Sequence, residues 1–186
     1  KLNSIKSIDS NIKYIEKELI EIFDFKPGNS KLTQAYLNQN KGDYVVYSSN
    51  TKNNGIFGYI NTFDYDSECI QITTNGVYAG TVFYREKHKF SINGDARLFF
   101  KKFDDLDYKY LVYELTKLFE ENKFSWENKP SLSKTKNLKI KIPINNKNEF
   151  CLENQKVIAM NFEKINYVKN LLRKELEKYQ TLAVEI

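Results

Sequence analysis

Histidine, cysteine and long apolar runs are the scarcest features of this chain. Its 186 residues include one histidine and two cysteines, Cys69 and Cys151, which lie far apart in the sequence. These residues cannot supply the four ligands of a usual structural zinc site. We interpret both cysteines as buried thiols in a reducing cytosol, with a single disulfide as the alternative. No apolar run approaches a membrane span and no signal peptide is visible, so we expect a cytoplasmic protein without a membrane partner.

A catalytic constellation is also missing from the sequence. The lone His88 lies in the polar run Arg85–Lys89, which we interpret as an exposed hairpin tip rather than the place of a general base. The glycines Gly55 and Gly58 lack the Lys-Ser/Thr pair of a phosphate-binding loop, and no Asn-Pro-Pro-aromatic tetrapeptide of an adenine methyltransferase occurs. We therefore expect no enzymatic activity, no cofactor and no metal. A small magnesium nuclease is the minor alternative, and it would use Asp64, Asp66 and Glu68.

Charge and aromatic surface are present in quantity. The hydrophobic fraction of 41% and the charged fraction of 28% are typical of a globular chain, and the length fits one domain with a helical extension. The net charge of +5 favours an anionic partner without requiring one. The 13 tyrosines and 13 phenylalanines fit an AT-rich genome, and they also supply flat faces suited to nucleic acid or protein.

Two helical patterns bracket the chain. Residues 2–23 carry apolar side chains at alternating spacings of three and four, which form a narrow stripe typical of a helix that pairs with another helix. A helix lying on its own domain is the alternative. A similar stripe runs along a long helix from about residue 152 to 182. The expected helix-pairing residues are Ile5, Ile8, Ile12, Ile15 and Leu19 in the first helix, and Ile158, Phe162, Ile165, Val168, Leu172, Leu176 and Tyr179 in the last.

Short apolar and aromatic strands alternate with polar loops between these two helices. The Asn-Gly pairs that end at Gly55, Gly76 and Gly94 tolerate positive φ and mark turns. A helix capped by Thr33 precedes the strands, a helix over 104–121 packs on them, and a strand over 138–142 follows. The pattern predicts an α+β fold with a compact, mostly antiparallel sheet, whose strands cover residues 44–47, 56–60, 68–73, 77–84, 89–92 and 96–100.

The polar loops are candidates for reading DNA. Asparagine can hold adenine through paired hydrogen bonds, and arginine or lysine can hold guanine through its two acceptors. Lysine, serine and threonine also hold phosphates and fix the register. A protein-interaction module, in which the helices bind a partner and the sheet is only a scaffold, is the alternative. The candidate DNA-binding residues are Lys41, Ser48, Ser49, Asn50, Lys52, Asn53, Asn54, Thr74, Asn75, Tyr78, Arg85, Lys87, His88, Lys89, Lys134 and Lys136.

Four segments, taken in order, resemble a known family. They are Gly42–Asn50, which reads Gly-Asp-Tyr-Val-Val-Tyr-Ser-Ser-Asn, then Ile72–Val82, then Ser91–Ala96, and finally Ile140–Pro143 leading to Gln155–Ala159. This set resembles the specificity subunits of type I restriction-modification systems and the related specificity domains of type IIG enzymes. Two departures are that Asn154 stands where glutamate is usual, and that residues 145–148 replace a proline-rich link.

The resemblance implies a non-catalytic reader of double-stranded DNA. Residues 25–150 would form a target recognition domain for one half of a bipartite sequence. Residues 1–24 and 151–186 would be spacer helices that set the distance to the second half-site. These helices would dock a DNA adenine methyltransferase subunit or domain, and a restriction subunit is a further candidate partner. One domain is half of a complete subunit, so the chain either pairs with itself through its helices or is part of a longer protein.

Overall fold

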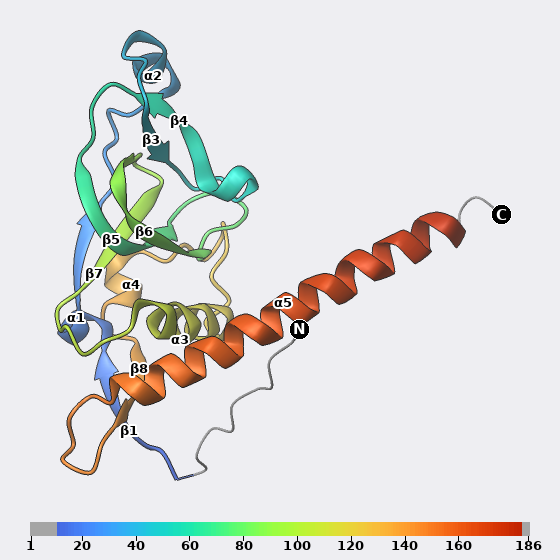
Figure 1. Ribbon diagram of the computed structural model, residues 1–186. Helices are drawn as coiled ribbons and strands as arrows, with labels where there is room; N and C mark the ends of the chain where they lie inside the picture. Colours follow the sequence, from blue (N-terminus) through green and yellow to red (C-terminus); the bar gives the residue numbers. More distant parts are fainter. Residues whose placement is uncertain (1–10, 184–186) are drawn as a thin grey trace.

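A six-stranded mixed sheet carries the polar loops of the chain (Figure 1). The computed structural model describes residues 11–183. All neighbouring strands of this sheet are antiparallel except β3 and β6, which pair in parallel. In spatial order the strands are β2 (Phe23–Pro27), β7 (Ala96–Lys101), β5 (Tyr65–Thr73), β6 (Val82–Ile92), β3 (Tyr44–Tyr47) and β4 (Ile56–Ile60).

The N-terminal segment does not form the predicted helix where the structure describes it. Residues 13–18 form strand β1 (Lys13–Glu18), which pairs antiparallel with β8 (Lys139–Ile144) in a two-stranded sheet. A single helical turn, α1 (Leu19–Ile22), then leads into β2. The prediction of one helix over residues 2–23 is therefore wrong for residues 13–18 and 23, and only the single turn over 19–22 is helical. The predicted pairing residues Ile5 and Ile8 lie outside the described residues.

Tertiary pairing explains this correction. Helix propensity is a weak preference that tertiary contacts readily override. The isoleucine-rich strand β8 offers a ladder of backbone partners, with Ile15 directly opposite Ile142. Ile15 packs against the main core and Leu19 is fully buried in it. In the described part of the stripe, Ile15, Leu19 and Ile22 thus face the domain's own core, and Ile12 packs against the cluster of Tyr110 with Ile158 and Ala159 of the C-terminal helix.

Strand β6 is a second correction to the sequence prediction. We expected two strands over 77–84 and 89–92 with a polar hairpin tip between them, but β6 is continuous from Val82 to Ile92. Ser67 pairs with His88 and Cys69 with Arg85, so the β6 side of the ladder carries one residue more than the β5 side. This β-bulge lets the charged run stay in the sheet while it redirects individual side chains.

Helix α3 (Tyr108–Glu121) covers one face of the large sheet, as the wide apolar arc predicts. Leu111, Leu115 and Phe119 are buried in one cluster with Ile70 and Ile72 of β5. The helix begins at an Asp107 cap, whose carboxylate accepts from the backbone N–H of residue 110 at 2.9 Å. The shorter helix α2 (Gln34–Gln39) has the predicted Thr33 cap. The remaining helix of one turn is α4 (Leu132–Thr135).

Helix α5 (Leu152–Ala183) confirms the predicted long C-terminal helix. Its first turns pack on α3, where Ile158 and Ala159 are buried against Tyr110, and the tilted rings of Phe162 and Tyr113 have their centroids 4.8 Å apart. Toward its C-terminal end the helix leaves the body (Figure 1), and at 32 residues it is about 48 Å long. Despite that length, neither α5 nor another helix between residues 11 and 183 has an apolar stretch sufficient to cross a bilayer.

A buried amide fixes the start of α5 to the body. Gln155 is fully buried, its Oε1 accepts from the Asp107 backbone N–H at 2.9 Å, and its Nε2 donates to the Asp105 carbonyl at 2.9 Å. Replacing Gln155 by leucine removes the partner of both part-buried backbone groups, and each loss costs about 1–2 kcal/mol. We therefore expect Gln155→Leu to lower the free energy of unfolding by roughly 2–4 kcal/mol in urea titrations.

The matched control is Gln39→Leu on α2, where the glutamine is exposed. We expect that change to stay within about 0.5 kcal/mol of the parent. Equal losses for the two variants would contradict a cross-linking role for Gln155.

The two cysteines give a second prediction. Both are free, Cys69 is fully buried in β5, and Cys151 is half-buried. Burial raises the pKa of the Cys69 thiol to about 12, so its reactive thiolate is scarce up to that pH. With a thiol-specific reagent at pH 8 we expect Cys151 to react in the folded protein and Cys69 to react only after denaturation. Fast labelling of both thiols in the native protein would overturn this assignment, and labelling of a Cys151→Ser variant isolates Cys69.

Candidate functional site

The loop between β3 and β4, residues 48–55, has an unusual backbone. Asn53, Asn54 and Gly55 adopt left-handed conformations in succession, with φ of 49°, 54° and 80°. The Ser48 hydroxyl accepts from the Asn50 backbone N–H at 3.1 Å, and the Asn50 side-chain oxygen accepts from Lys52 N–H at 3.0 Å. Ser48 and Asn50 therefore support the β3–β4 loop, whereas the side chains of residues 52–54 are exposed. Consecutive left-handed residues store strain that the surrounding structure must hold, a feature common at functional sites.

Arg85 lies beneath the β3–β4 loop and is 2% exposed. Its Nε donates to Gln71 Oε1 at 2.9 Å, and its Nη2 donates to the Asn54 carbonyl at 2.9 Å. Gln71, also fully buried, donates from Nε2 to the Ser48 carbonyl at 2.8 Å. The prediction that Arg85 contacts DNA from an exposed hairpin tip is therefore wrong in its placement. Burial lowers the pKa of Arg85 to about 10, which leaves the guanidinium charged at neutral pH.

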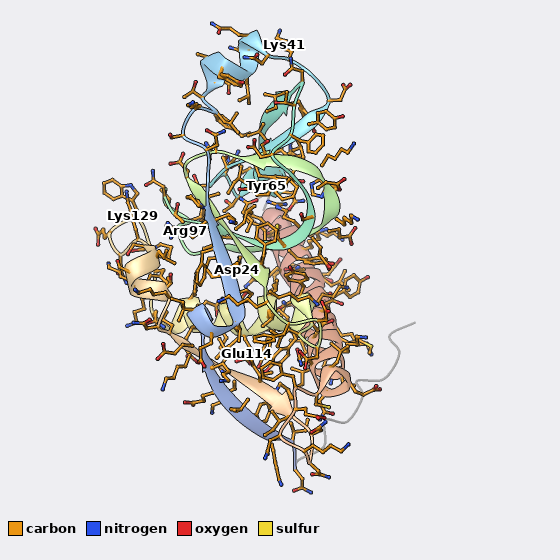
Figure 2. All side chains as sticks on the ribbon, turned by 90° about the vertical axis from the view of Figure 1, so that its left-hand side faces the viewer. Asp24, Lys41, Tyr65, Arg97, Glu114 and Lys129 are labelled. Atoms are coloured by element: carbon orange, nitrogen blue, oxygen red, sulfur yellow. The ribbon has the colours of Figure 1, made fainter. Side chains whose placement is uncertain are left out.

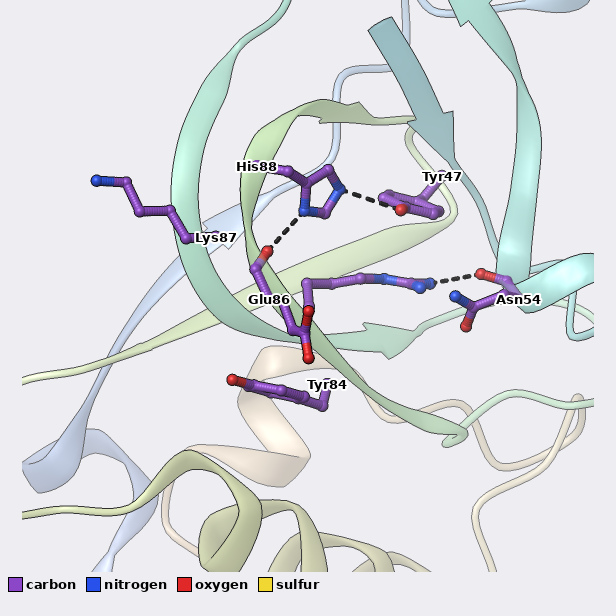
Figure 3. A pocket seen from close by; sticks show the side chains of 7 residues that line it. Tyr47, Asn54, Tyr84, Glu86, Lys87 and His88 are labelled. Carbon is purple, nitrogen blue, oxygen red and sulfur yellow. Dashed lines mark hydrogen bonds between the residues drawn. The ribbon is translucent and has the colours of Figure 1, made fainter.

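His88 is also part of the sheet instead of a hairpin tip. Its Nδ1 is 2.6 Å from the Glu86 carbonyl oxygen, and its Nε2 is 3.1 Å from the Tyr47 hydroxyl. Because a carbonyl only accepts, Nδ1 carries the proton in the neutral ring and Nε2 accepts from the tyrosine. His88 and Tyr47 line a cavity of about 430 Å³ together with Asn54, Tyr84, Arg85 and Glu86 (Figure 3). Lys87 points away from the Tyr47 side of this cavity (Figure 3).

The loop between β5 and β6, residues 74–81, lies next to the β3–β4 loop. The hydroxyls of Thr73 and Thr81 both donate to the Tyr78 carbonyl, at 2.6 and 2.7 Å. A Cβ added at Gly76 would lie 3.6 Å from the Ser49 hydroxyl, which places the two loops in contact range. Val77 and Tyr78 point outward, with 78% and 59% of their surface exposed. The β5–β6 loop is therefore a fixed turn that presents an apolar and an aromatic side chain.

Asn75 is tied down and does not project from the loop. Its Nδ2 donates to Asp95 Oδ1 at 3.0 Å, and the neighbouring Thr74 backbone N–H donates to the Asp95 carbonyl at 2.8 Å. Of the three residues predicted to bind DNA from this loop, Tyr78 alone is exposed, and Thr74 and Asn75 are half-buried.

The other predicted residues spread over the body. Lys134 on α4 donates to Asn128 Oδ1 at 2.8 Å, and Lys89 lies 4.9 Å from the Phe63 ring centroid. Lys136 follows α4 and is half-buried. Lys41 lies beside α2 at one end of the body (Figure 2). The structure thus brings together the β3–β4 and β5–β6 loops but leaves Lys41 outside that surface.

Residues 122–131 form a third loop, which contains none of the predicted DNA-binding residues. A Cβ added at Gly80 would lie 2.9 Å from Phe124 Cβ, so this loop adjoins the β5–β6 loop. A cavity of about 350 Å³ is lined by the β5–β6 loop, by α3 and by Phe124. Trp126 is 60% exposed, and the Lys129 ammonium lies 5.8 Å from its ring centroid. A lone tryptophan in a polar stretch was the available signal for this contact surface.

The side chains of these three loops are of the kinds that bind a partner. They present amides, lysines and aromatic rings, which bind bases, phosphates and apolar edges. Among residues 11–183, no three His, Cys, Asp or Glu side chains gather in a way that could hold a metal ion. In the acidic run proposed for a nuclease, Glu68 accepts a hydrogen bond from the Tyr84 hydroxyl and the Asp64 backbone N–H donates to Ser91. These contacts belong to the sheet.

Known proteins with similar sequences point to the same class. The family described as the type I restriction modification DNA specificity domain matches residues 11–179. A Mycoplasma pneumoniae protein named as a type I specificity subunit is 32% identical over 160 residues, which are 86% of this chain and 42% of that protein. The specificity subunit of the type I restriction enzyme MpnII from the same organism is 36% identical over 113 residues, which are 61% of this chain and 33% of that subunit. The relatives are named specificity subunits, in agreement with the predicted non-catalytic component.

Solved structures share the fold. The S subunit of a type I restriction-modification system from M. genitalium superposes with a TM-score of 0.64 at 18% identity, covering 91% of this chain and 43% of that one. The HsdS subunit from Thermoanaerobacter tengcongensis gives a TM-score of 0.61 at 14% identity, covering 93% and 42%. This chain therefore spans less than half the length of those structures and of the first relatives by sequence. The predicted resemblance is confirmed, and the chain belongs to the family of type I restriction-modification DNA specificity domains.

Proposed function

We propose that this chain reads one half-site of a bipartite DNA sequence as the specificity component of a cytoplasmic restriction-modification system. The observation that carries the proposal is the proximity of the β3–β4 and β5–β6 loops, which together display exposed polar and aromatic side chains from a braced backbone. Rigidly held side chains discriminate between bases because they cannot adjust to the wrong one.

Different side chains of this surface suit different parts of DNA. The exposed amides of Asn53 and Asn54 match the paired acceptor and donor of adenine in the major groove. The exposed ammonium groups of Lys52 and Lys87 suit phosphates, which fix register without reading sequence. Tyr78 can contact a base or sugar edge through its ring. The net charge of +5 supports this polyanionic partner.

The distal part of α5 supports a role in assembly. Ile165, Leu172, Leu176 and Tyr179 are between 43% and 67% exposed, at spacings of three, four and seven. A row of apolar side chains on a helix that leaves the body is the surface that helix pairing buries. We propose that it pairs with a helix of a second copy or of the other half of a longer subunit. The assembled helices would set the spacing between half-sites and dock a DNA adenine methyltransferase subunit, beside which a restriction subunit can bind.

The reading surface can be tested with side-chain deletions that fit the backbone. Glycine adopts left-handed φ freely, so Asn53→Gly with Asn54→Gly removes both amides without adding strain. We expect this double variant to lose about 1–3 kcal/mol of preference for the target duplex and to keep its affinity for random duplex. The measurement is fluorescence anisotropy, with the methyltransferase subunit present, on duplexes that carry methylation sites mapped in the source genome.

A phosphate contact by Lys52 affects how the DNA affinity depends on salt concentration. Lys52→Gln should weaken binding to all duplexes alike and lower the slope of log affinity against log salt by about 0.9. Lys147→Gln, in the exposed turn before α5, is the control that removes the same charge elsewhere. A parent protein that prefers no duplex at any salt concentration would refute the proposed function.

The helix surface is tested by association. Ile165→Gln with Leu172→Gln keeps helix propensity but removes the apolar row, so we expect weaker association with a second copy or with the methyltransferase subunit. Light scattering and co-elution measure this, and circular dichroism should show an intact fold. Lys174→Gln, exposed on the same helix, is the matched control. Unchanged mass and unchanged partner binding in the double variant would contradict helix pairing.

A further inference from the structure

The guanidinium of Arg85 is a buried charge without a counter-ion. Within residues 11–183, no carboxylate oxygen lies within 4.0 Å of it. Its hydrogen-bond partners are the neutral side chain of Gln71 and the Asn54 carbonyl, and Nη1 has no partner. A buried charge held by neutral groups contributes little or nothing to stability compared with apolar side chains of similar volume. Its presence therefore calls for an explanation other than stability.

The hydrogen bonds around Arg85 reach both ends of the β3–β4 loop. Nη2 binds the carbonyl of Asn54 near the end of the loop, and Gln71 carries the connection to the carbonyl of Ser48 at its beginning. The Ser48 backbone N–H donates to the Gly55 carbonyl at 2.9 Å, which closes the base of the loop. Arg85 and Gln71 thus join strands β6 and β5 to the two points that determine the path of the loop.

The loop is also shaped sterically around the guanidinium. A Cβ added at Gly55 would lie 2.9 Å from Arg85 Nη2, and Gly55 has a φ of +80°. The guanidinium carbon lies 3.7 Å from the ring centroid of Tyr47 and 4.6 Å from that of Phe83. Stacking on these rings fixes the plane of the guanidinium, and the plane fixes where its donors point.

We infer that Arg85 and Gln71 are positioning residues that determine which bases are read, because they hold the backbone from which Asn53 and Asn54 project. The inference rests on the proposed function and deepens it. Both side chains are almost completely buried, so they act through the loop backbone that they hold. Their effect is on discrimination between sequences, and phosphate contacts made elsewhere continue to supply non-specific affinity.

Gln71→Glu separates positioning from stability. The carboxylate can still accept from Arg85 Nε and pairs with its charge, so we expect the melting temperature to stay at the parent value or rise. A carboxylate has no donor for the Ser48 carbonyl, so the beginning of the loop is released. We expect backbone amides of residues 48–56 to exchange with deuterium roughly 10-fold faster than in the parent. The ratio of target to random duplex affinity should fall by roughly 10-fold or more, with an unchanged salt slope.

Arg85→Met is the second variant, because methionine retains length and removes all the donors. It should produce the same local increase in exchange and the same loss of discrimination. Arg97→Met on β7 removes an identical charge from the same sheet and is the matched control, with parental exchange in residues 48–56 and a parental affinity ratio expected. If Arg85→Met does not fold, Gln71→Glu decides the question alone.

The outcomes separate this inference from the proposed function. A parent protein without preference for any duplex refutes the proposed function, and loop exchange in Gln71→Glu then still reports whether the pair positions the loop. A parent that does discriminate, together with Gln71→Glu at parental exchange and a parental affinity ratio, overturns the inference. That result would leave Arg85 and Gln71 as core residues only.

Discussion

An uncompensated positive charge inside the sheet is the constraint on which the loop arrangement depends. Arg85 is surrounded by Gln71, by a carbonyl of the β3–β4 loop and by the ring of Tyr47. In a low-dielectric interior each of these neutral groups must keep its place, because the alternative is an unsatisfied charge. The left-handed run that ends at Gly55 brings the Asn54 carbonyl to Arg85 Nη2, and the absence of a Cβ at Gly55 leaves space for the guanidinium.

At the other end of the molecule, a buried glutamine again bonds the backbone of a neighbouring segment. Gln155 joins α5 to the backbone at residues 105 and 107, as Gln71 joins the β3–β4 loop to the sheet. Strand β1 pairs with β8, which runs directly toward α5, so the beginning of the described chain is also tied to the base of this helix. The loops and the helix base therefore belong to one braced body. In the proposed function, this continuity is what lets a helix-defined spacing constrain the position of a base-reading loop.

The sequence predicts those elements of the fold that depend on residues close together in the chain. Strands β3 and β4, the Thr33 cap and the long helix α5 follow the sequence pattern, because turns, caps and periodicity act over a few residues. The segment before α1 escapes prediction because its partner β8 is far along the chain. The apolar pattern at Ile12, Ile15 and Leu19 indicates only that these side chains are buried against other residues. It does not indicate whether the segment that carries them is a helix or a strand.

The reading surface is predictable as a region but not residue by residue. Polar residues in and around the β3–β4 loop are of two kinds. Lys52 and Asn53 have exposed side chains, whereas Ser48 and Arg85 form hydrogen bonds that support the loop backbone. Composition treats both kinds alike, and the charged neighbours of Arg85 make it look exposed. The difference arises from a bulge in β6 and from a glutamine on the adjacent strand. Under the proposed function, sequence preference is therefore a property of the supporting layer as well as of the exposed one. A change of specificity among related chains can then arise beneath the loop while every residue facing DNA stays the same.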